Sequence, residues 1–434
     1  MTTTLLAFWR SLPVPVRRAA HRTLGAPGAA YRAVADRVDE MKKRHADNVA
    51  LATALREAPR SDAPPALPVT IVGFHSAVHG LGEGARMLAR GFADAGLTTR
   101  AIDLSSQVAF AADLAHTFLA PAEDERGVVI SHINPPELMD WARRTEGRPL
   151  KGRRHIGYWA WELERPPSDW TPAFALVDEV WTPSAFATDA IRKIAPTRVK
   201  VSTVPYPLYL NPRPKADRER FGLPDKAVVV LMAFDLRSSA QRKNPQATLR
   251  AFQQARAAAR RPAFLVCKVV GADRHPETFA SLQAEVADDP SIRLMTENLS
   301  AEDMASLTAS VDIVLSLHRS EGYGLLLAEA IWLGKPSLAT GWSSNVEFMD
   351  PASSQLVDYT LIPVQGNDLI YRDGRWADAD VDDAARKLTR MIDDEAWRAE
   401  LAGATTRNRH VSFNRDAWLE MARGLLPSLS PLAP

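Results

Sequence analysis

The stretch that decides the fold is LSLHRSEGYGLLLAEAIWLGKPSLATGWSSNVEFM, residues 315–349. The apolar run at residues 311–317 has the length of a buried strand. A glycine turn follows at residues 322–324, a helix is expected at residues 325–332, and a second short strand at residues 336–340. This order predicts an α/β unit whose turn points backbone N–H groups, at the positive end of a helix, toward an anion.

Two glutamates frame this turn. Glu321 precedes it, and Glu329 stands eight positions later, inside the expected helix and among apolar residues. A carboxylate in that setting is costly unless a hydrogen bond compensates it, and a ribose diol would provide such a bond. The alternative is that Glu321 caps the helix and that Glu329 is a solvated or salt-bridged helix residue.

The two glutamates, with Gly-Tyr-Gly after the first and Gly-Lys-Pro after the helix, resemble the nucleotide-sugar site of retaining glycosyltransferases of family 4. The resemblance covers roughly residues 69–425. It implies the α/β fold called GT-B, in which two Rossmann-like parallel-sheet domains face a cleft. We expect a helical basic extension at residues 1–64, an acceptor domain at 65–207, a nucleotide-sugar domain at 208–408, and a terminal helix at 409–434 that packs back on the acceptor domain.

The bulk properties narrow the class of protein. A chain of 434 residues suggests more than one domain, and a net charge of +1 gives no global sign of nucleic-acid binding. The single cysteine, Cys267, lies in an apolar run, where we expect it to be buried; this excludes an intramolecular disulfide framework and fits a reducing compartment. The sequence shows neither an apolar run of membrane-spanning length nor a secretory signal, so a cytoplasmic enzyme is expected.

The start of the chain has a different composition. Before Asp36 there are arginines but no acidic residue, and an apolar cluster includes Leu5, Phe8 and Trp9. Residues 29–55 have a helical pattern. Three interpretations stay open: a basic amphipathic anchor on the inner face of a membrane, a helical extension that packs on its own body or on a second subunit, and a transit peptide.

A glycine-rich segment follows the first expected strand, residues 69–74. It reads His79-Gly80-Leu81-Gly82-Glu83-Gly84, and we expect it to be a loop before a helix that starts at Ala85. Such a motif alone also occurs in ordinary tight turns. The resemblance implies that Gly80 and Gly82 approach the donor diphosphate and the acceptor.

Polar side chains also stand at the ends of later strands, where a parallel sheet binds its ligands. Many family 4 enzymes carry a histidine at one such end, but residues 156–162, where that strand aligns, contain none. His132, with Asn134 beside it, is therefore the candidate for an acceptor contact, and Glu162 is the alternative acid or base. A lone histidine also has a structural interpretation.

Two tryptophans near Glu162 have two interpretations. Trp159 and Trp161 could form the floor of an acceptor-sugar site, or they could fill the space between packed elements.

The strand expected at residues 227–234 ends in a basic loop. A diphosphate leaving group gains negative charge as the glycosidic bond breaks, and without a metal it needs fixed cations. The resemblance implies that Arg237 and Lys243 supply them, whereas Arg242 is expected to be exposed. A solvated basic loop is the alternative. The resemblance also implies that Asn298 and Leu299 contact the nucleotide base.

Together these residues imply a retaining, metal-independent glycosyltransferase. It would move a hexose, with mannose as one candidate, from a nucleotide-diphosphate sugar to a glycan or lipid-linked acceptor in bacterial polysaccharide or lipopolysaccharide biosynthesis. Glu329 would bind the ribose, Glu321 the hydroxyls of the donor sugar, and the amides of Gly322, Tyr323 and Gly324 the diphosphate.

The sequence was also searched for metal-binding motifs and for other functions of this fold. The chain has no Cys/His cluster with zinc spacing, and Asp378-Ala379-Asp380 lies in a charged segment, so no metal is expected. Two alternatives remain: a catalytically idle GT-B partner protein, and another GT-B nucleotide-sugar enzyme such as a 2-epimerase.

Overall fold

The structure, a computed structural model, describes residues 39, 43, 46–51, 53–55, 68–107, 118–121, 127–365, 370–371 and 374–425. The acid-free segment before Asp36, and with it the proposed membrane anchor, lies outside the described residues.

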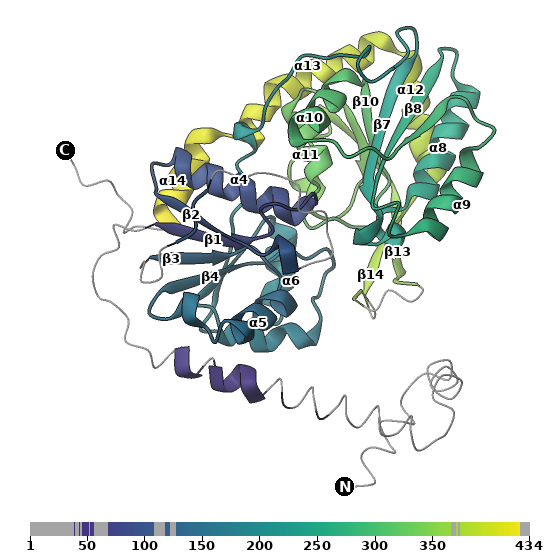
Figure 1. Cartoon of the computed structure of the whole chain (residues 1–434). Coiled ribbons are helices and arrows are strands. Elements are labelled where there is room, and N and C mark those ends of the chain that lie inside the picture. Colours follow the sequence, from purple (N-terminus) through teal and green to yellow (C-terminus); the bar gives the residue numbers. More distant parts are fainter. Residues whose placement is uncertain are drawn as a thin grey trace, which may run out of the picture.

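Two six-stranded parallel sheets form the two lobes of the molecule (Figure 1). The first sheet has the order β2-β1-β3-β4-β5-β6 and the second the order β12-β11-β10-β7-β8-β9. In each sheet the first strand along the chain, β1 in one and β7 in the other, lies inside the sheet, and later strands are added on both sides of it. Doubly wound nucleotide-binding folds have the same arrangement. The α/β fold expected from the sequence is therefore confirmed.

The N-terminal lobe alternates short strands with helices. Its strands are β1 Val69–Gly73, β2 Thr99–Asp103, β3 Val128–Ser131, β4 Arg154–Tyr158, β5 Glu179–Thr182 and β6 Lys200–Thr203. Its helices are α4 Gly80–Asp94, α5 Pro135–Arg144 and α6 Ala185–Arg192, with short 3-10 turns η1 Ser105–Gln107, η2 Arg148–Leu150, η3 Ser168–Ala175 and η4 Leu208–Leu210.

The C-terminal lobe has longer central strands. Its strands are β7 Val228–Asp235, β8 Ala263–Val270, β9 Ile292–Met295, β10 Ile313–Ser316, β11 Ser337–Thr340, β12 Ser354–Val357 and the antiparallel pair β13 Tyr359–Pro363 and β14 Arg375–Ala379. Its helices are η5 Leu236–Ser238, α7 Ala240–Lys243, α8 Pro245–Ala258, α9 Pro276–Val286, α10 Ala301–Ser310, α11 Leu325–Trp332, η6 Ser344–Glu347, α12 Val381–Asp393, α13 Glu395–Ser412 and α14 Arg415–Leu425.

Pairing between β7 and β8 shows how the second sheet presents residues to a ligand. The two strands are in register over eight residues, from Val228 opposite Ala263 to Asp235 opposite Val270. Because strand side chains alternate, Cys267 lies in the core between the sheet and its helices, as expected from the sequence, while Lys268 is on the opposite face.

Two helix boundaries differ from those expected. The glycine-rich segment is not a loop, because α4 starts at Gly80 and the glycines form its first turns. The sequence also predicts one helix at residues 381–403, but the structure divides it at Asp394, whose carboxylate caps α13 by accepting from the N–H of Trp397. A short polar side chain that bonds nearby N–H groups ends one helix and starts the next.

The last helices connect the two lobes, as Figure 1 shows. Helix α13 packs against α11 of the C-terminal lobe, and α14 lies on the N-terminal lobe. Trp418 of α14 packs against Phe92 of α4 and donates its indole N–H to the carbonyl of Pro205 at 2.8 Å. Arg415 pairs with Asp94 at 2.9 Å.

The described part of the N-terminal extension is helical and packs on the chain's own N-terminal lobe. Leu51 and Leu55 join the apolar cluster beneath the first sheet, and a Cβ on Gly147 would lie 2.9 Å from Leu55. Leu51 and Leu55 therefore contact the chain's own N-terminal lobe.

Gly82 provides a test of this packing. A Cβ at that position would lie 2.5 Å from the carbonyl oxygen of Ala77 and 2.7 Å from that of Phe74, both rigid backbone atoms. We expect Gly82→Ala to lower the free energy of unfolding by roughly 2 kcal/mol or more. The control is Gly424→Ala, whose Cβ meets nothing within 4 Å in α14; it should be neutral or stabilising by about 0.5–1 kcal/mol. Equal denaturant midpoints for the two variants would contradict the packing.

Candidate functional site

A cavity of about 240 Å³ lies between the two lobes, at the carboxyl ends of β1 and β7. Its walls come from the start of α4, the ends of β7 and β8, the loop before α10, and α11. The lining residues are Val78, His79, Gly80, Glu83, Arg86, Ala233, Phe234, Asp235, Lys268, Val270, Asn298, Leu299, Ser300, Ala301, Met304, Leu325, Leu326 and Glu329. Of the residues expected to bind the nucleotide, Gly80, Asn298, Leu299 and Glu329 meet here.

The start of α4 forms one wall. The His79 side chain caps this helix, because its Nδ1 accepts from the N–H of Gly82 at 3.2 Å. Burial, and then the charge of Arg237, lower the pKa of His79 to about 4, so its ring is neutral at pH 7. A neutral ring is what the cap requires, since a charged imidazole has no acceptor nitrogen.

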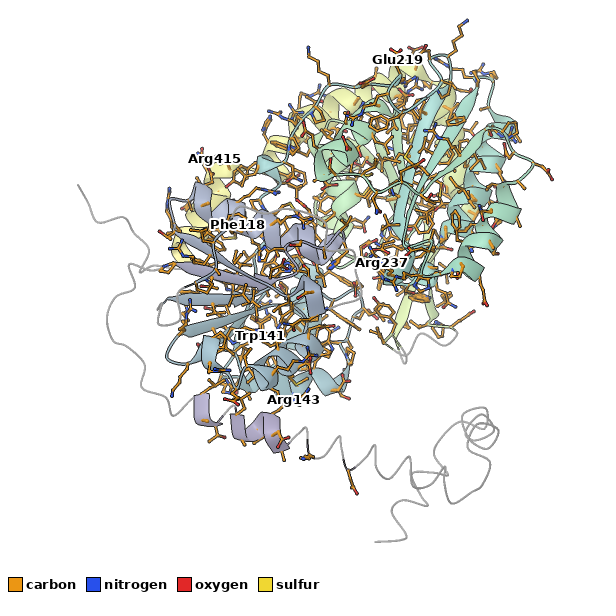
Figure 2. All side chains as sticks on the ribbon, viewed as in Figure 1. Phe118, Trp141, Arg143, Glu219, Arg237 and Arg415 are labelled. Carbon is orange, nitrogen blue, oxygen red and sulfur yellow. The ribbon has the colours of Figure 1, made fainter. Side chains whose placement is uncertain are left out.

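Arg237 lies at the edge of the cavity, on the side of its lobe that faces the N-terminal lobe (Figure 2). It starts from the short turn η5 after β7. Its guanidinium is held by Asp235, with Nη2 to Oδ2 at 2.7 Å, and it also donates to the carbonyl of Val78 in the other lobe at 2.8 Å. Both of these partners line the cavity.

Lys243 and Glu321 do not line the cavity but form an ion pair beside it. Lys243 Nζ is 2.5 Å from Glu321 Oε1, and Arg242 Nη1 is 3.2 Å from Oε2. Burial alone would raise the pKa of Glu321, but the charges of Lys243 and then Arg242 outweigh it and lower that pKa to about 2. Glu321 is therefore a firmly held carboxylate.

The expectation that Arg242 is exposed was wrong. Its side chain is 3% exposed and donates to the carbonyl of Ser320 at 2.7 Å. The physical reason is that residues 240–243 form the helical turn α7, which directs Arg242 inward to Glu321 instead of leaving it on a solvated loop.

The glycine turn before α11 is held tightly between the lobes. Gly324 has φ +89°, a left-handed conformation that suits glycine at the start of this helix. The carbonyl of Gly322 accepts from Ser184 Oγ at 2.7 Å, and a Cβ on Gly322 would lie 2.9 Å from the carbonyl oxygen of Trp161. The ring of Tyr323 packs edge-on against Tyr206.

Glu329 extends from α11 into the cavity wall. Its Oε1 accepts from Asn211 Nδ2 at 3.3 Å. Burial, and then the charge of Glu83, raise the pKa of Glu329 to about 8. The sequence indicated that this carboxylate needs a hydrogen-bond partner, and the partner within the chain is an amide.

His132 lies in the core of the N-terminal lobe and is not among the residues that line the cavity. Its ring stacks on Tyr158 with centroids 4.7 Å apart, and its Nε2 is 2.9 Å from the hydroxyl of Tyr206. Burial lowers its pKa to about 3. Its companion Asn134 is also engaged, since its Oδ1 accepts from the N–H of Ala160 at 3.0 Å.

Glu162, the alternative acid or base, belongs to the ion cluster around Arg242. Its carboxylate accepts from the hydroxyl of Tyr371 at 3.1 Å and lies 3.8 Å from Arg242. The neighbouring Trp159 and Trp161 are 0% and 2% exposed and pack against Trp170. Packing is therefore the interpretation that the structure supports for both tryptophans.

Sequence reasoning missed Lys268. It is 2% exposed and lines the cavity from the face of β8 opposite the core. The signal was present, because a lysine inside the apolar run Ala263–Val270 must reach solvent or a polar site.

Among the described residues, no group of three or more histidine, cysteine or acidic side chains could hold a metal ion. In the same part of the chain, none of the helices has the length and apolar character needed to cross a membrane.

Solved structures of known proteins place this fold in a class. The HepE protein of Anabaena, solved in complex with UDP and glucose, superposes with a TM-score of 0.60 at 13% identity, covering 83% of this chain and 99% of that one. A glycosyltransferase of Rickettsia africae superposes with a TM-score of 0.58 at 12% identity, covering 85% of this chain and 99% of that one. At these identities the likeness concerns the fold, which is that of GT-B glycosyltransferases.

Sequence comparison gives the family. The model for the family described as family 4 glycosyltransferase in conflict systems matches residues 189–425, more than half of the chain. The D-inositol 3-phosphate glycosyltransferase of Nocardioides sp. is 30% identical over 215 residues, which are 46% of this chain and 42% of that protein. The chain thus spans less than half the length of this curated relative. The chain belongs to family 4 of the glycosyltransferases.

The raised pKa of Glu329 makes stability depend on pH. The carboxyl group binds its proton more tightly in the folded than in the unfolded protein, so stability falls as the pH rises from the unfolded pKa of about 4.5 to the folded pKa of about 8. Glu329→Gln keeps the acceptor for Asn211 and removes the charge. We expect it to unfold at the same temperature as the wild type at pH 4 and at a higher temperature at pH 8.5. A thermal-unfolding difference that does not change with pH would contradict the assignment.

Proposed function

We propose that this enzyme transfers a hexose from a nucleotide-diphosphate sugar to a glycan or lipid-linked acceptor, with retention of anomeric configuration and without a metal. The observation that carries the proposal is the cavity between the lobes, where Gly80 from α4, Asn298 and Leu299 from the loop before α10, and Glu329 from α11 come together. Its lining of mostly apolar side chains with a few polar groups suits a nucleoside.

In this proposal, each part of the nucleotide-sugar donor has residues of the chain that would bind it. Glu329 would accept from the ribose hydroxyls, and Asn298 and Leu299 would contact the base. The diphosphate would lie toward Arg237 and the glycine turn at residues 322–324. Lys243 and Glu321, already paired, would reach the second phosphate and the sugar hydroxyls.

The proposed reaction uses this arrangement. The bond between the anomeric carbon and the phosphate oxygen breaks while the acceptor oxygen bonds to the same face of the sugar. The acceptor's proton passes to the departing phosphate oxygen. Arg237 and Lys243 would stabilise the charge on the diphosphate, the role that a divalent cation fills in other transferases.

The pathway and location are part of the proposal. We infer a role in bacterial surface-polysaccharide or lipopolysaccharide biosynthesis, in the cytoplasm or at the inner face of the membrane. The support is the form of the HRSEGYG and GYWAWELE segments and the arginine-rich start of the chain. The solved HepE complexes make UDP-sugars the first donors to test, beside GDP- and ADP-sugars.

Arg237 provides the sharpest test of donor binding. We expect Arg237→Ala to weaken nucleoside-diphosphate binding by about tenfold or more, because one charge-assisted contact to phosphate is lost. The nucleotide is chosen by a thermal-shift screen of UDP, GDP and ADP and their sugars. Calorimetry then compares this variant with Arg274→Ala, which removes an exposed arginine of the same lobe outside the cavity. Equal affinities for both variants would show that the diphosphate does not bind at Arg237.

Metal independence has its own test. We expect release of nucleoside diphosphate from the donor, followed with and without acceptor, to proceed unchanged in EDTA. Activity lost in EDTA and restored by Mn²⁺ would show that the fixed cations are not sufficient. Absence of release with every donor and acceptor, despite nucleotide binding, would support the idle-partner alternative.

A further inference from the structure

Asn211 connects the two lobes at the edge of the cavity. It follows η4 in the segment between the first sheet and the second. Its N–H donates to the carbonyl of Leu208 at 2.9 Å, and its carbonyl accepts from the indole N–H of Trp332 in α11 at 2.9 Å. Its backbone is thus tied to both lobes.

The chemistry of Arg90 sets the orientation of the Asn211 side chain. Arg90 Nη2, from α4, lies 3.2 Å from Asn211 Oδ1. A guanidinium can only donate, so the amide oxygen must face Arg90 and the amide N–H₂ must face the other way. On that side lies Glu329, whose Oε1 is 3.3 Å from Nδ2.

These bonds leave one carboxylate oxygen for a ligand. Asn211 engages Oε1 of Glu329, and Oε2 has no hydrogen bond to any residue that the structure describes. An amide holds the carboxylate in place without neutralising it, whereas an arginine or lysine partner would form an ion pair that competes with a hydroxyl.

The hydrogen bonds of Asn211 continue through Arg90 to the wall of the cavity that α4 forms. Arg90 Nη2 is also 2.9 Å from Glu83 Oε1, and Glu83 lines the cavity from α4. A second, smaller cavity of about 190 Å³ is also lined by Glu83, Arg90, Asn211 and Glu329. The chain of bonds from Glu83 through Arg90 and Asn211 to Glu329 therefore borders both cavities.

We infer that Asn211 is a positioning residue for the donor: its amide aims Glu329 at the ribose and links that aim to helix α4 of the other lobe. The inference rests on the proposed function, because it needs a nucleotide in the cavity. Asn211 itself need not touch the ligand.

The test compares UDP with 2′-deoxy-UDP by calorimetry on the full chain, or GDP with 2′-deoxy-GDP if GDP binds more tightly. The wild type should favour the ribonucleotide by about tenfold, since the buried carboxylate loses a hydroxyl partner with the deoxy form. In Asn211→Ala the ribonucleotide should weaken by a similar factor and the deoxynucleotide should be nearly unaffected, so that the ratio approaches one. A purely structural role for Asn211 would weaken both nucleotides alike.

Two further variants control this experiment. Asn408→Ala removes an amide that donates to Asp350 at 3.0 Å, in α13 and outside the cavity, and it should keep the wild-type ratio. Asn211→Asp keeps the size and the acceptor for Arg90 but has no N–H for Glu329, so it should lose the ratio even if the alanine variant unfolds.

The outcomes separate the two proposals. If the wild type discriminates between the nucleotides and Asn211→Asp still does, the positioning role is overturned and the proposed function stands. If the wild type binds UDP and 2′-deoxy-UDP equally, the assignment of Glu329 to the ribose falls, and the role of Asn211 falls with it. If none of UDP, GDP and ADP binds, the proposed function itself fails.

Discussion

Charge compensation at the facing edges of the two sheets is the constraint on which the site depends. Parallel sheets direct their polar strand ends into one interface, where water is partly excluded and an unpaired carboxylate is costly. Of the three carboxylates that line the cavity, Glu83 pairs with Arg86 and Arg90, and Asp235 pairs with Arg237. Glu321, beside the cavity, is held by Lys243 and Arg242. Only Glu329 among those lining residues has an amide as its partner.

The same constraint explains how the lobes fit together. Contacts across one rim are polar and specific: the carboxylate of Glu347 accepts from the N–H groups of Ala185 and Phe186 at the start of α6, at 2.8 and 2.7 Å, and Ser320 Oγ donates to the carbonyl of Glu162. The first of these is a helix cap supplied by the other lobe, which is favoured because a helix N-terminus attracts negative charge. These contacts close the lobes beside Gly322, while the cavity stays hollow beside Gly80.

The fold could be predicted from the sequence because its strands are continuous apolar runs. The run at residues 263–271 is an example, since β8 is buried along nearly its whole length. Glu329 and Gly80, which the family resemblance assigns to the donor site, both line the cavity. Features that depend on contacts between residues far apart in the sequence could not be predicted. The inward orientation of Arg242 is one of them, because it depends on Glu321, which is 79 residues away in the chain. The core position of His132 likewise depends on Tyr206, which is 74 residues away.

Glu329 shows why such a site departs from the pattern of the rest of the protein. The other two carboxylates that line the cavity, Glu83 and Asp235, each pair with a cation, and the structure around them is satisfied without a ligand. A cation at Glu329 would lower its pKa and stabilise the protein at neutral pH, but it would also occupy the oxygens that a diol needs. An amide partner fixes the direction of the carboxyl group without adding a positive charge, so the pKa of Glu329 stays raised to about 8, in a setting where low polarity strengthens any hydrogen bond that a ligand brings. Local stability and readiness for a ligand oppose each other at this position, and that conflict is the physical mark of a binding residue.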